Sequence, residues 1–323
     1  MRFLPCLLAL AVCLLRPAAA EEFLPGVKRI VFLGDSITYS GQYVDRFEAF
    51  LFTQFPQREF EVIDCGLPSE TVSGLSEEGH AGGKFPRPDL HERLDRVLAK
   101  TKPDVIFACY GMNDGIYLPF AEDRFQKFKD GILKLRAKAA AAGAQVIHLT
   151  PPVFDPVPIK DRVASAERAD ASHPLKDYDD VLARYSAWLI EQRAQGWQVI
   201  DIHEPMSAAL AARRALAPQF TFAKDGVHAD AGGHAVIAQA LLDGLAPVQA
   251  EVFEETVANN WLQQSAGVEF LQSIAKRRKL LSDAWLNEIG HQRPGMAKGL
   301  PLAEAEQQAA ALERAIRAAK PSR

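Results

Sequence analysis

Residues 31–40 read VFLGDSITYS, and this stretch decides how the fold is interpreted. An apolar run that ends at Leu33 leads into Gly34, Asp35 and Ser36, after which the chain becomes polar. A buried strand with this ending holds one hydroxyl, that of Ser36, at its C-terminal tip. Ser36 is therefore either a turn residue or a nucleophile, and its neighbours in the fold decide between the two.

Similar apolar runs recur along the chain and alternate with longer amphipathic segments. They are short and show little polar alternation, which is typical of parallel strands buried on both faces. The predicted strands are Arg29–Leu33, Phe60–Cys65, Asp104–Tyr110, Gln145–Thr150 and Gln198–Ile202. The predicted helices are Gln42–Gln54, Asp89–Lys100, Arg124–Ala142, Asp177–Gln195 and Ala231–Leu245. This alternation predicts a doubly wound α/β/α sandwich on a parallel sheet, in which ligands collect outside the C-terminal strand ends.

The two ends of the chain depart from this alternation. Arg2, an apolar run and the small residues Ala18–Ala20 predict a cleaved signal peptide over residues 1–20, and hence an exported protein. Residues 21–247 form the predicted α/β domain. Residues 248–323 contain no strand candidate and predict a helical extension that ends in a helix from Leu302 to about Ala319.

The composition argues against several classes of partner. The net charge is −4 and no long basic run is present, so nucleic-acid binding is not expected. Outside the signal peptide, no segment approaches the roughly 18 apolar residues of a membrane span. No metal-binding motif is found, so neither a metal nor another cofactor is expected. We interpret the local basic cluster Lys276–Lys279 as the solvated face of a helix.

A serine nucleophile needs a base, and the base needs an acid that orients it. His228 lies three residues after Asp225, just before a predicted amphipathic helix. At this spacing the carboxylate reaches Nδ1 while Nε2 faces outward. The alternative is that Asp225 and Gly226 form a turn and that His228 is a surface residue. His148 lies within a predicted strand, and we interpret it as a buried core residue.

Acyl transfer also needs hydrogen-bond donors that point at the developing oxyanion. Gly66 follows the second predicted strand and offers a backbone N–H. Asn113 follows the third predicted strand and offers a side-chain amide. Taken alone, a turn explains the glycine and a helix cap explains the asparagine equally well.

Taken in order along the chain, these fragments resemble the four blocks of the SGNH (GDSL-type) hydrolases. The resemblance covers roughly residues 27–245 and rests on GDSIT, the glycine after the second strand, GMND and DGVH. It implies a flavodoxin-like strand order and a serine esterase. The second block departs from the family's N-x-G pattern, because it reads DCGLPSETVSG here.

The resemblance also assigns roles to the candidate residues. Ser36 matches the nucleophile, His228 the general base and Asp225 the acid that orients the base. The N–H groups of Ser36 and Gly66 and the side chain of Asn113 match the oxyanion hole.

The same resemblance bears on Cys65 and Cys109, which both follow the predicted signal peptide. A flavodoxin-like order inserts the first strand between the second and the third, which separates the two cysteines by roughly 9–10 Å. A disulfide needs Cα atoms closer than about 7 Å. We therefore expect two free, buried thiols.

The segment after the second block, GLSEEGHAGGKFPRPDLHERL, holds groups that suit a polar ligand. His80 and Lys84 in this segment are candidate substrate contacts, and Tyr110 at the end of the third strand is another. The alternative is that the segment is a solvated connection and that Tyr110 packs in the core.

The leading hypothesis is an exported serine esterase that removes short acyl groups, acetyl in particular, from carbohydrate. A lysophospholipase or thioesterase-like hydrolase of longer acyl esters is the alternative within the same class. A non-catalytic binding protein on the same scaffold and a metal-dependent hydrolase are alternatives from other classes. The expected partner is a small-molecule or saccharide ester, and the sequence does not fix the oligomeric state.

Overall fold

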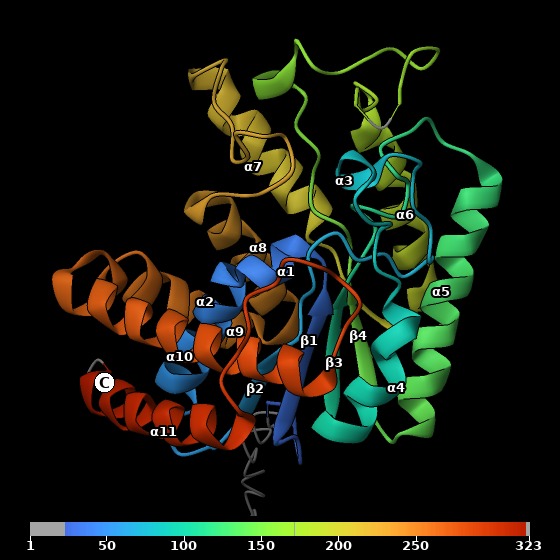
Figure 1. The fold of residues 1–323 in the computed structure, drawn as a ribbon. Helices are drawn as coiled ribbons and strands as arrows, with labels where there is room; N and C mark the ends of the chain where they lie inside the picture. The colour runs from blue at the N-terminus through green and yellow to red at the C-terminus, as the bar shows by residue number, and fades with distance from the viewer. Residues whose placement is uncertain (1–22, 171, 321–323) are drawn as a thin grey trace, which may run out of the picture.

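Five parallel strands form one sheet in the order β2-β1-β3-β4-β5 (Figure 1). The computed structural model describes residues 23–170 and 172–320, so the predicted signal peptide lies outside the described residues. The strands are β1 (Arg29–Gly34), β2 (Glu61–Asp64), β3 (Val105–Cys109), β4 (Gln145–Leu149) and β5 (Gln198–Ile200). This is the flavodoxin-like order, and the predicted fold class is confirmed.

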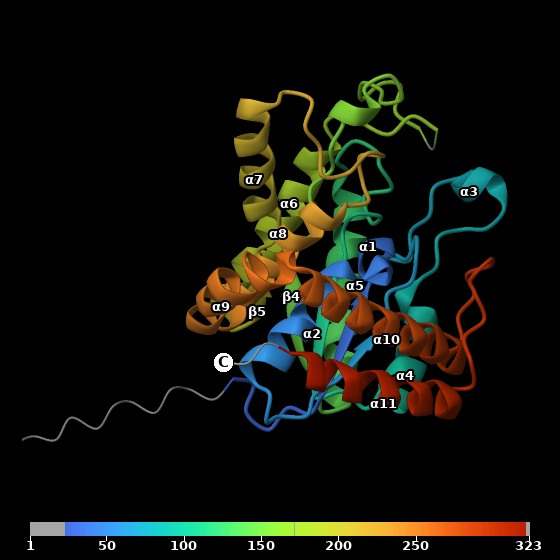
Figure 2. The same cartoon turned by 90° about the vertical axis from the view of Figure 1, so that its left-hand side faces the viewer.

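Helices cover both faces of the sheet (Figures 1 and 2). One face carries α2 (Gln42–Gln54) and α8 (Ala231–Leu245), and the other carries α4 (Leu90–Thr101), α5 (Glu122–Ala141) and α6 (Tyr178–Glu191). The other α-helices of the described residues are α1 (Ser36–Ser40), α3 (His80–Gly83), α7 (His203–Leu216), α9 (Pro247–Phe253), α10 (Ser265–Ile289) and α11 (Leu302–Ala319). The five helices predicted for the α/β domain are present, whereas α1, α3 and α7 are not among the predicted helices. No helix among the described residues has the length and apolar character of a membrane span.

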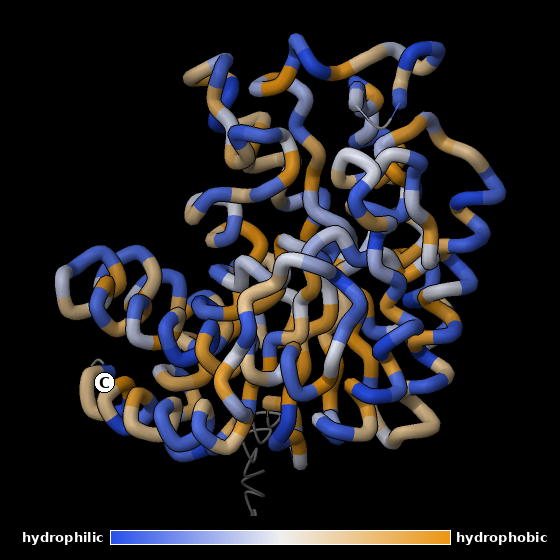
Figure 3. The backbone as a smooth tube through the Cα atoms, in the orientation of Figure 1, coloured by the Kyte–Doolittle hydropathy of each residue, from blue (hydrophilic) through white to orange (hydrophobic). Residues whose placement is uncertain are grey.

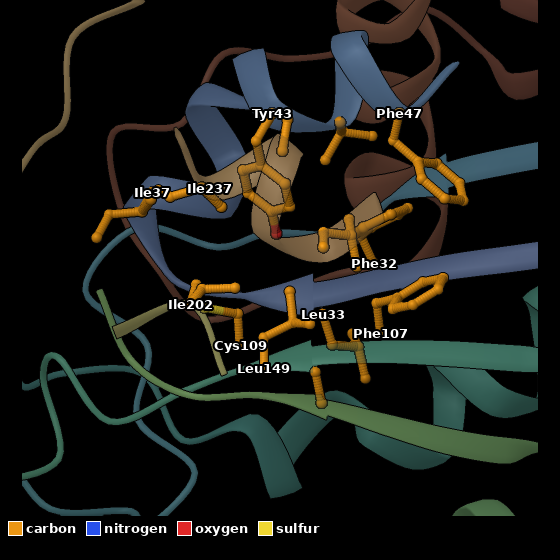
Figure 4. Packing of buried hydrophobic residues seen from close by; sticks show 14 of the residues in the cluster. Phe32, Leu33, Ile37, Tyr43, Phe47, Phe107, Cys109, Leu149, Ile202 and Ile237 are labelled. Atoms are coloured by element: carbon orange, nitrogen blue, oxygen red, sulfur yellow. The ribbon is translucent and has the colours of Figure 1, made fainter. Parts of the chain in front are cut away.

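Aromatic side chains join the sheet to α2 (Figure 4). Phe32 of β1 stacks on Phe107 of β3 with ring centroids 4.9 Å apart, and Phe47 of α2 meets Phe32 edge-on at 5.4 Å. All three are buried, and burial of one such side chain contributes about 1.5–3 kcal/mol. Hydrophobic residues gather in the central strands, whereas hydrophilic ones lie toward the outside (Figure 3). The core therefore holds the C-terminal ends of β1 and β3 side by side.

The strand order also separates the two cysteines. β1 lies between β2 and β3, and its Gly34 pairs with Cys109. Cys65 follows β2 on the other side of β1, where its N–H donates to the carbonyl of Phe32. Both thiols are free and buried, as expected.

The C-terminal extension packs on the α/β domain. α10 lies against α2, β2 and α4, and α11 packs on α10 (Figure 2). Arg277 and Arg278 of α10 are only 6% and 4% exposed, so the interpretation of Lys276–Lys279 as a solvated face is wrong for these two residues. The physical reason is that buried carboxylates of α2 and β2 pair with both guanidinium groups.

Candidate active site

Ser36 lies at the first position of α1, directly beyond the C-terminal end of β1. Asp35 caps this helix, because its Oδ1 accepts the N–H of Ile37 at 2.9 Å. Gly34 allows the chain to fold back at this point, since a Cβ there would lie 2.1 Å from Oγ1 of Thr38. The GDS sequence therefore holds the Ser36 hydroxyl at the tip of a tight strand-to-helix turn.

His228 and Asp225 lie in the loop before α8 and meet Ser36 at this edge. Nε2 of His228 is 2.8 Å from Oγ of Ser36, and Nδ1 of His228 is 2.6 Å from Oδ2 of Asp225. Oδ1 of Asp225 accepts the backbone N–H of His228 at 2.8 Å. The structure thus brings Ser36, His228 and Asp225 into one hydrogen-bonded line.

This contact changes the acidity of both loop residues. The hydrogen bond that His228 donates to Asp225 raises the pKa of His228 above its ordinary 6.5, even though partial burial lowers it. Burial raises the pKa of Asp225, but hydrogen bonds from the side chain and backbone of His228 outweigh it and hold the pKa far below its ordinary value. Asp225 is therefore a carboxylate at neutral pH, and it favours the protonated form of the imidazole.

Asn113 follows β3 and is 4% exposed. Its Nδ2 lies 3.4 Å from Oδ2 of Asp35 and 3.2 Å from the carbonyl of Glu70, which places the amide beside the turn that carries the serine. Its Oδ1 accepts Nη1 of Arg87 at 2.8 Å and the hydroxyl of Tyr117 at 3.2 Å. Two donors therefore fix which end of the amide faces the site.

Gly66 has a different environment from the one expected of an oxyanion donor. Its N–H donates to Oδ1 of Asp64 at 2.9 Å, and a Cβ on it would lie 2.3 Å from the backbone nitrogen of Tyr39. Gly66 thus allows α1 to pack closely on the chain after β2, and its N–H is already engaged. Ser69, three residues further on, has a left-handed φ of +68°. Among the described residues, no hydrogen bond uses the N–H of Ser69 or of Ser36.

A cavity of about 350 Å³ opens beside the loop that holds Asp225 and His228. It reaches Asp225 and Val227, and its walls include His80, Arg87, Tyr117 and Phe154. Larger hollows of about 860 and 990 Å³ lie elsewhere among the described residues, and their linings include none of the residues of the Ser36–His228–Asp225 line. The smaller cavity is therefore the candidate substrate site, and Asp225 is the residue of that line that borders it.

The structure places the three predicted substrate contacts in different environments. His80 lines the cavity, and its Nδ1 lies 3.2 Å from Oε1 of Glu77. Lys84 is exposed and does not line the cavity. Tyr110 is only 2% exposed and its hydroxyl donates to the buried Glu70 at 2.7 Å, so its prediction as a substrate contact is wrong. Its ring completes the core at the end of β3.

Arg87 lies in the segment whose charged groups are expected to suit a polar ligand, but it is not among the predicted substrate contacts. It is 9% exposed, and Nε and Nη2 donate to the two oxygens of Glu77 at 2.6 and 2.7 Å. Its guanidinium lies over the ring of Tyr117, 5.3 Å from the centroid. Its contact with Asn113 and its place in the wall of the cavity link it to the site. Among the described residues, no cluster of His, Cys, Asp and Glu side chains fits a metal ion.

Comparison with models of protein families assigns the chain to a family. The model of the GDSL-like lipase/acylhydrolase family matches residues 32–236, a range that holds Ser36, Asn113, Asp225 and His228. The protein belongs to this family and is a carboxylic ester hydrolase. No curated protein matches the sequence.

Several solved structures resemble this chain at low sequence identity. A gut microbial diltiazem-metabolizing enzyme is 22% identical with a TM-score of 0.51, and the match covers 68% of this chain and 48% of that one. The chain therefore spans about half the length of that enzyme. A catalytic mutant of an acetylxylan esterase from Geobacillus stearothermophilus is 18% identical over 68% of this chain and 94% of its own, with a TM-score of 0.47. The acetyl xylan esterase AlAXEase is 18% identical over 67% and 99%, with a TM-score of 0.48.

Proposed function

We propose that the protein cleaves esters through an acyl-enzyme on Ser36. The observation that carries this proposal is the line from Oγ of Ser36 through His228 to Asp225, with contacts of 2.8 and 2.6 Å. Nε2 of His228 takes the hydroxyl proton as Oγ attacks the ester carbonyl, and then gives this proton to the departing alcohol. A water activated by the same nitrogen hydrolyses the acyl-serine and restores the enzyme.

Asp225 orients the imidazole and stabilises its charge. Its Oδ2 accepts a hydrogen bond from the N–H at Nδ1 of His228. Because the imidazole proton is then on Nδ1, Nε2 carries the lone pair that a general base needs. Its carboxylate also stabilises the imidazolium that forms while Ser36 attacks. This role explains why the raised pKa of His228 accompanies a lowered pKa of Asp225.

Three donors are proposed for the oxyanion. The first is the N–H of Ser36, which has no partner among the described residues at the start of α1. The second is the side-chain amide of Asn113, whose two contacts, at 3.4 and 3.2 Å, are longer than the 2.9 Å bond that engages the N–H of Gly66. For the third we propose the N–H of Ser69 in place of Gly66. The N–H of Leu67 donates to the carbonyl of Gly34, and the carbonyl of Glu70 accepts Asn113, so the segment between them lies beside both other donors.

The proposed substrate is a short acyl ester, acetyl in particular, of a carbohydrate. The cavity of about 350 Å³ supports this choice, because its walls combine the aromatic rings of Tyr117 and Phe154 with the polar groups of Arg87 and His80. Rings and fixed hydrogen-bonding groups suit the faces and hydroxyls of a sugar, whereas a long acyl chain needs a continuous apolar channel.

A substrate screen tests this assignment. Acetylated oligosaccharides, lysophospholipids and nitrophenyl esters of increasing chain length are offered to the protein, with Ser36→Ala as the background. We expect the highest kcat/KM on acetyl esters and release of acetate from the saccharides. A maximum at eight or more acyl carbons, or turnover of lysophospholipids alone, overturns the substrate assignment in favour of the longer-chain hydrolase.

Export is proposed on the sequence of residues 1–20. Expression of the full chain in a bacterium with a secretory pathway, followed by N-terminal sequencing, tests it. We expect a mature protein that begins at Glu21 and is recovered outside the cytoplasm. An uncleaved chain in the cytoplasm contradicts the proposal.

A further inference from the structure

The C-terminal extension reaches the helix that carries Ser36. The family match ends at residue 236, so α10 lies outside it. In Figure 2, α10 runs below α1 and beside α2, and it packs against both α2 and β2. Its contacts therefore lie close to the turn of the proposed nucleophile.

Arg278 makes the central contact of this interface. Its Nε donates to Oδ1 of Asp45 on α2 at 2.5 Å, and its Nη1 donates to Oδ2 of Asp64 on β2 at 2.9 Å. Its Nη2 donates to the backbone carbonyl of Ser40 at 2.9 Å. Only 4% of the residue is exposed, so water does not compete for these bonds. One guanidinium thus joins α2, β2 and the last residue of α1.

The chain leaves room for this guanidinium. Gly41 ends α1 with a left-handed φ of +72°, and a Cβ on it would lie 2.0 Å from Cζ of Arg278. A side chain at position 41 and the guanidinium cannot both occupy this place. The turn between α1 and α2 is therefore built around Arg278.

The end of α1 is held from a second side as well. Nε2 of His234 on α8 lies 2.8 Å from Oγ of Ser40. α1 has only five residues, so its two ends are about 6 Å apart and move as one unit. Asp64, the partner of Arg278, also accepts the N–H of Gly66 through its other oxygen. A displacement of Arg278 therefore acts on both the serine helix and the chain after β2.

We infer that Arg278 is a positioning residue of the active site: by fixing the carbonyl of Ser40 and the carboxylate of Asp64, it keeps Oγ of Ser36 within hydrogen-bonding distance of His228. This inference rests on the proposed function, because it takes Ser36 as the nucleophile. On this inference, the C-terminal extension helps to position the nucleophile of the hydrolase.

Arg277 provides a matched control on the same helix. It is 6% exposed and its Nη1 and Nη2 each donate at 2.8 Å, to Glu48 on α2 and to Glu313 on α11. Neither partner belongs to α1 or to the chain after β2. Arg277→Met and Arg278→Met therefore each remove one buried guanidinium from carboxylate partners, but only the second releases Ser40.

The test compares these two variants in the full-length protein. Circular dichroism and thermal unfolding fix a temperature at which both are folded, and kcat, KM and the rate of Ser36 labelling by a fluorophosphonate are measured there. We expect Arg278→Met to lower kcat and the labelling rate together by up to about 100-fold, the cost of an ångström-scale misplacement, with KM changed less than threefold. Arg277→Met is expected to keep both rates within threefold of the parent.

Equal loss in both variants, or a parental kcat in Arg278→Met, overturns the inference. If Arg278→Met does not fold, Arg278→Lys decides, because lysine keeps the charge but cannot make all three contacts. A kcat at the parental level in folded Arg278→Lys also overturns the inference. Ser36→Ala separates the two claims: if this variant remains active, the proposed function fails, whereas an inactive Ser36→Ala with equal arginine variants defeats the positioning role alone.

Discussion

Nη1 of Arg87 donates to Oδ1 of Asn113 at 2.8 Å, and both side chains are buried. The guanidinium withdraws electron density from the carbonyl end of the amide, which makes the NH₂ end a stronger donor. The same hydrogen bond holds the Asn113 amide in one orientation, because it prevents rotation about the last side-chain bond. Glu77 holds Arg87 from the other side, so the amide is supported by a chain of charged contacts.

Arg87→Met is therefore expected to weaken the oxyanion hole. We expect kcat to fall roughly 10- to 100-fold, which is less than the roughly 100- to 1,000-fold cost of removing an oxyanion donor itself. Tyr117→Phe removes the weaker bond to the same oxygen, at 3.2 Å, and should cost under about tenfold. Steady-state kinetics on an acetyl ester measure both. A larger loss in Tyr117→Phe than in Arg87→Met contradicts this ranking.

The pH dependence of kcat/KM should follow His228. A general base works when it is neutral, so activity should rise with pH through a pKa above the ordinary 6.5. Asp225→Asn removes the hydrogen bond that raises this pKa, and the acid limb should therefore move to lower pH. The plateau should fall by roughly 10⁴-fold, because the imidazole loses its orientation and its counter-charge. An acid limb that stays in place shows that Asp225 does not control the base.

His148 should make the fold sensitive to acid. It is 1% exposed and stacks on Trp197 at 5.4 Å, and burial lowers its pKa to about 3. Between the ordinary pKa of 6.5 and pH 3, the unfolded chain binds a proton that the folded one does not. The free energy of unfolding should therefore fall with falling pH in this window, by at most about 1.4 kcal/mol per pH unit from this group.

His148→Leu removes this contribution and should flatten the slope, as measured by urea unfolding at a series of pH values. His234, whose pKa burial lowers to about 4, supplies part of the remaining slope. An unaltered slope in His148→Leu would falsify the assignment.

Gly66 and Ser69 should respond in opposite ways to substitution. Gly66→Ala forces a Cβ to 2.3 Å from the backbone of α1, so we expect a loss of about 1–3 kcal/mol in the free energy of unfolding. Ser69→Gly relieves a left-handed residue and should stabilise the protein or leave it unchanged, with kcat kept, since the backbone N–H remains. Chemical unfolding and kinetics measure both. A loss of kcat in Ser69→Gly contradicts the proposal that only the N–H of Ser69 acts.

The sequence predicts those parts of the fold that depend on local pattern. All five strands follow from short apolar runs, and α2 and α8 have the predicted bounds. The sequence does not predict the helix α7, because only His203, Met206 and Leu210 on it are buried and its apolar stripe is therefore narrow. Likewise, α1 is too short to show any helical period.

Pairings between distant residues are beyond the reach of such patterns. Arg278 lies more than two hundred positions after Asp45 and Asp64, and nothing in its neighbours along the chain shows that carboxylates face it. The prediction of Tyr110 as a substrate contact is wrong for the same reason, because its partner Glu70 lies on another segment of the chain. In the second block, the motif draws attention to a glycine, whereas the left-handed position belongs to Ser69.

Detection of the acyl-enzyme tests the central claim most directly. The protein is mixed with an acetyl ester, quenched in acid within the first turnovers and digested, and the peptide that holds Ser36 is weighed by mass spectrometry. We predict one added acetyl group on Ser36 in the parent, and neither label nor turnover in Ser36→Ala. Steady turnover by Ser36→Ala at the parental rate, or an acetyl group on another residue that forms and decays at the rate of turnover, would contradict the account.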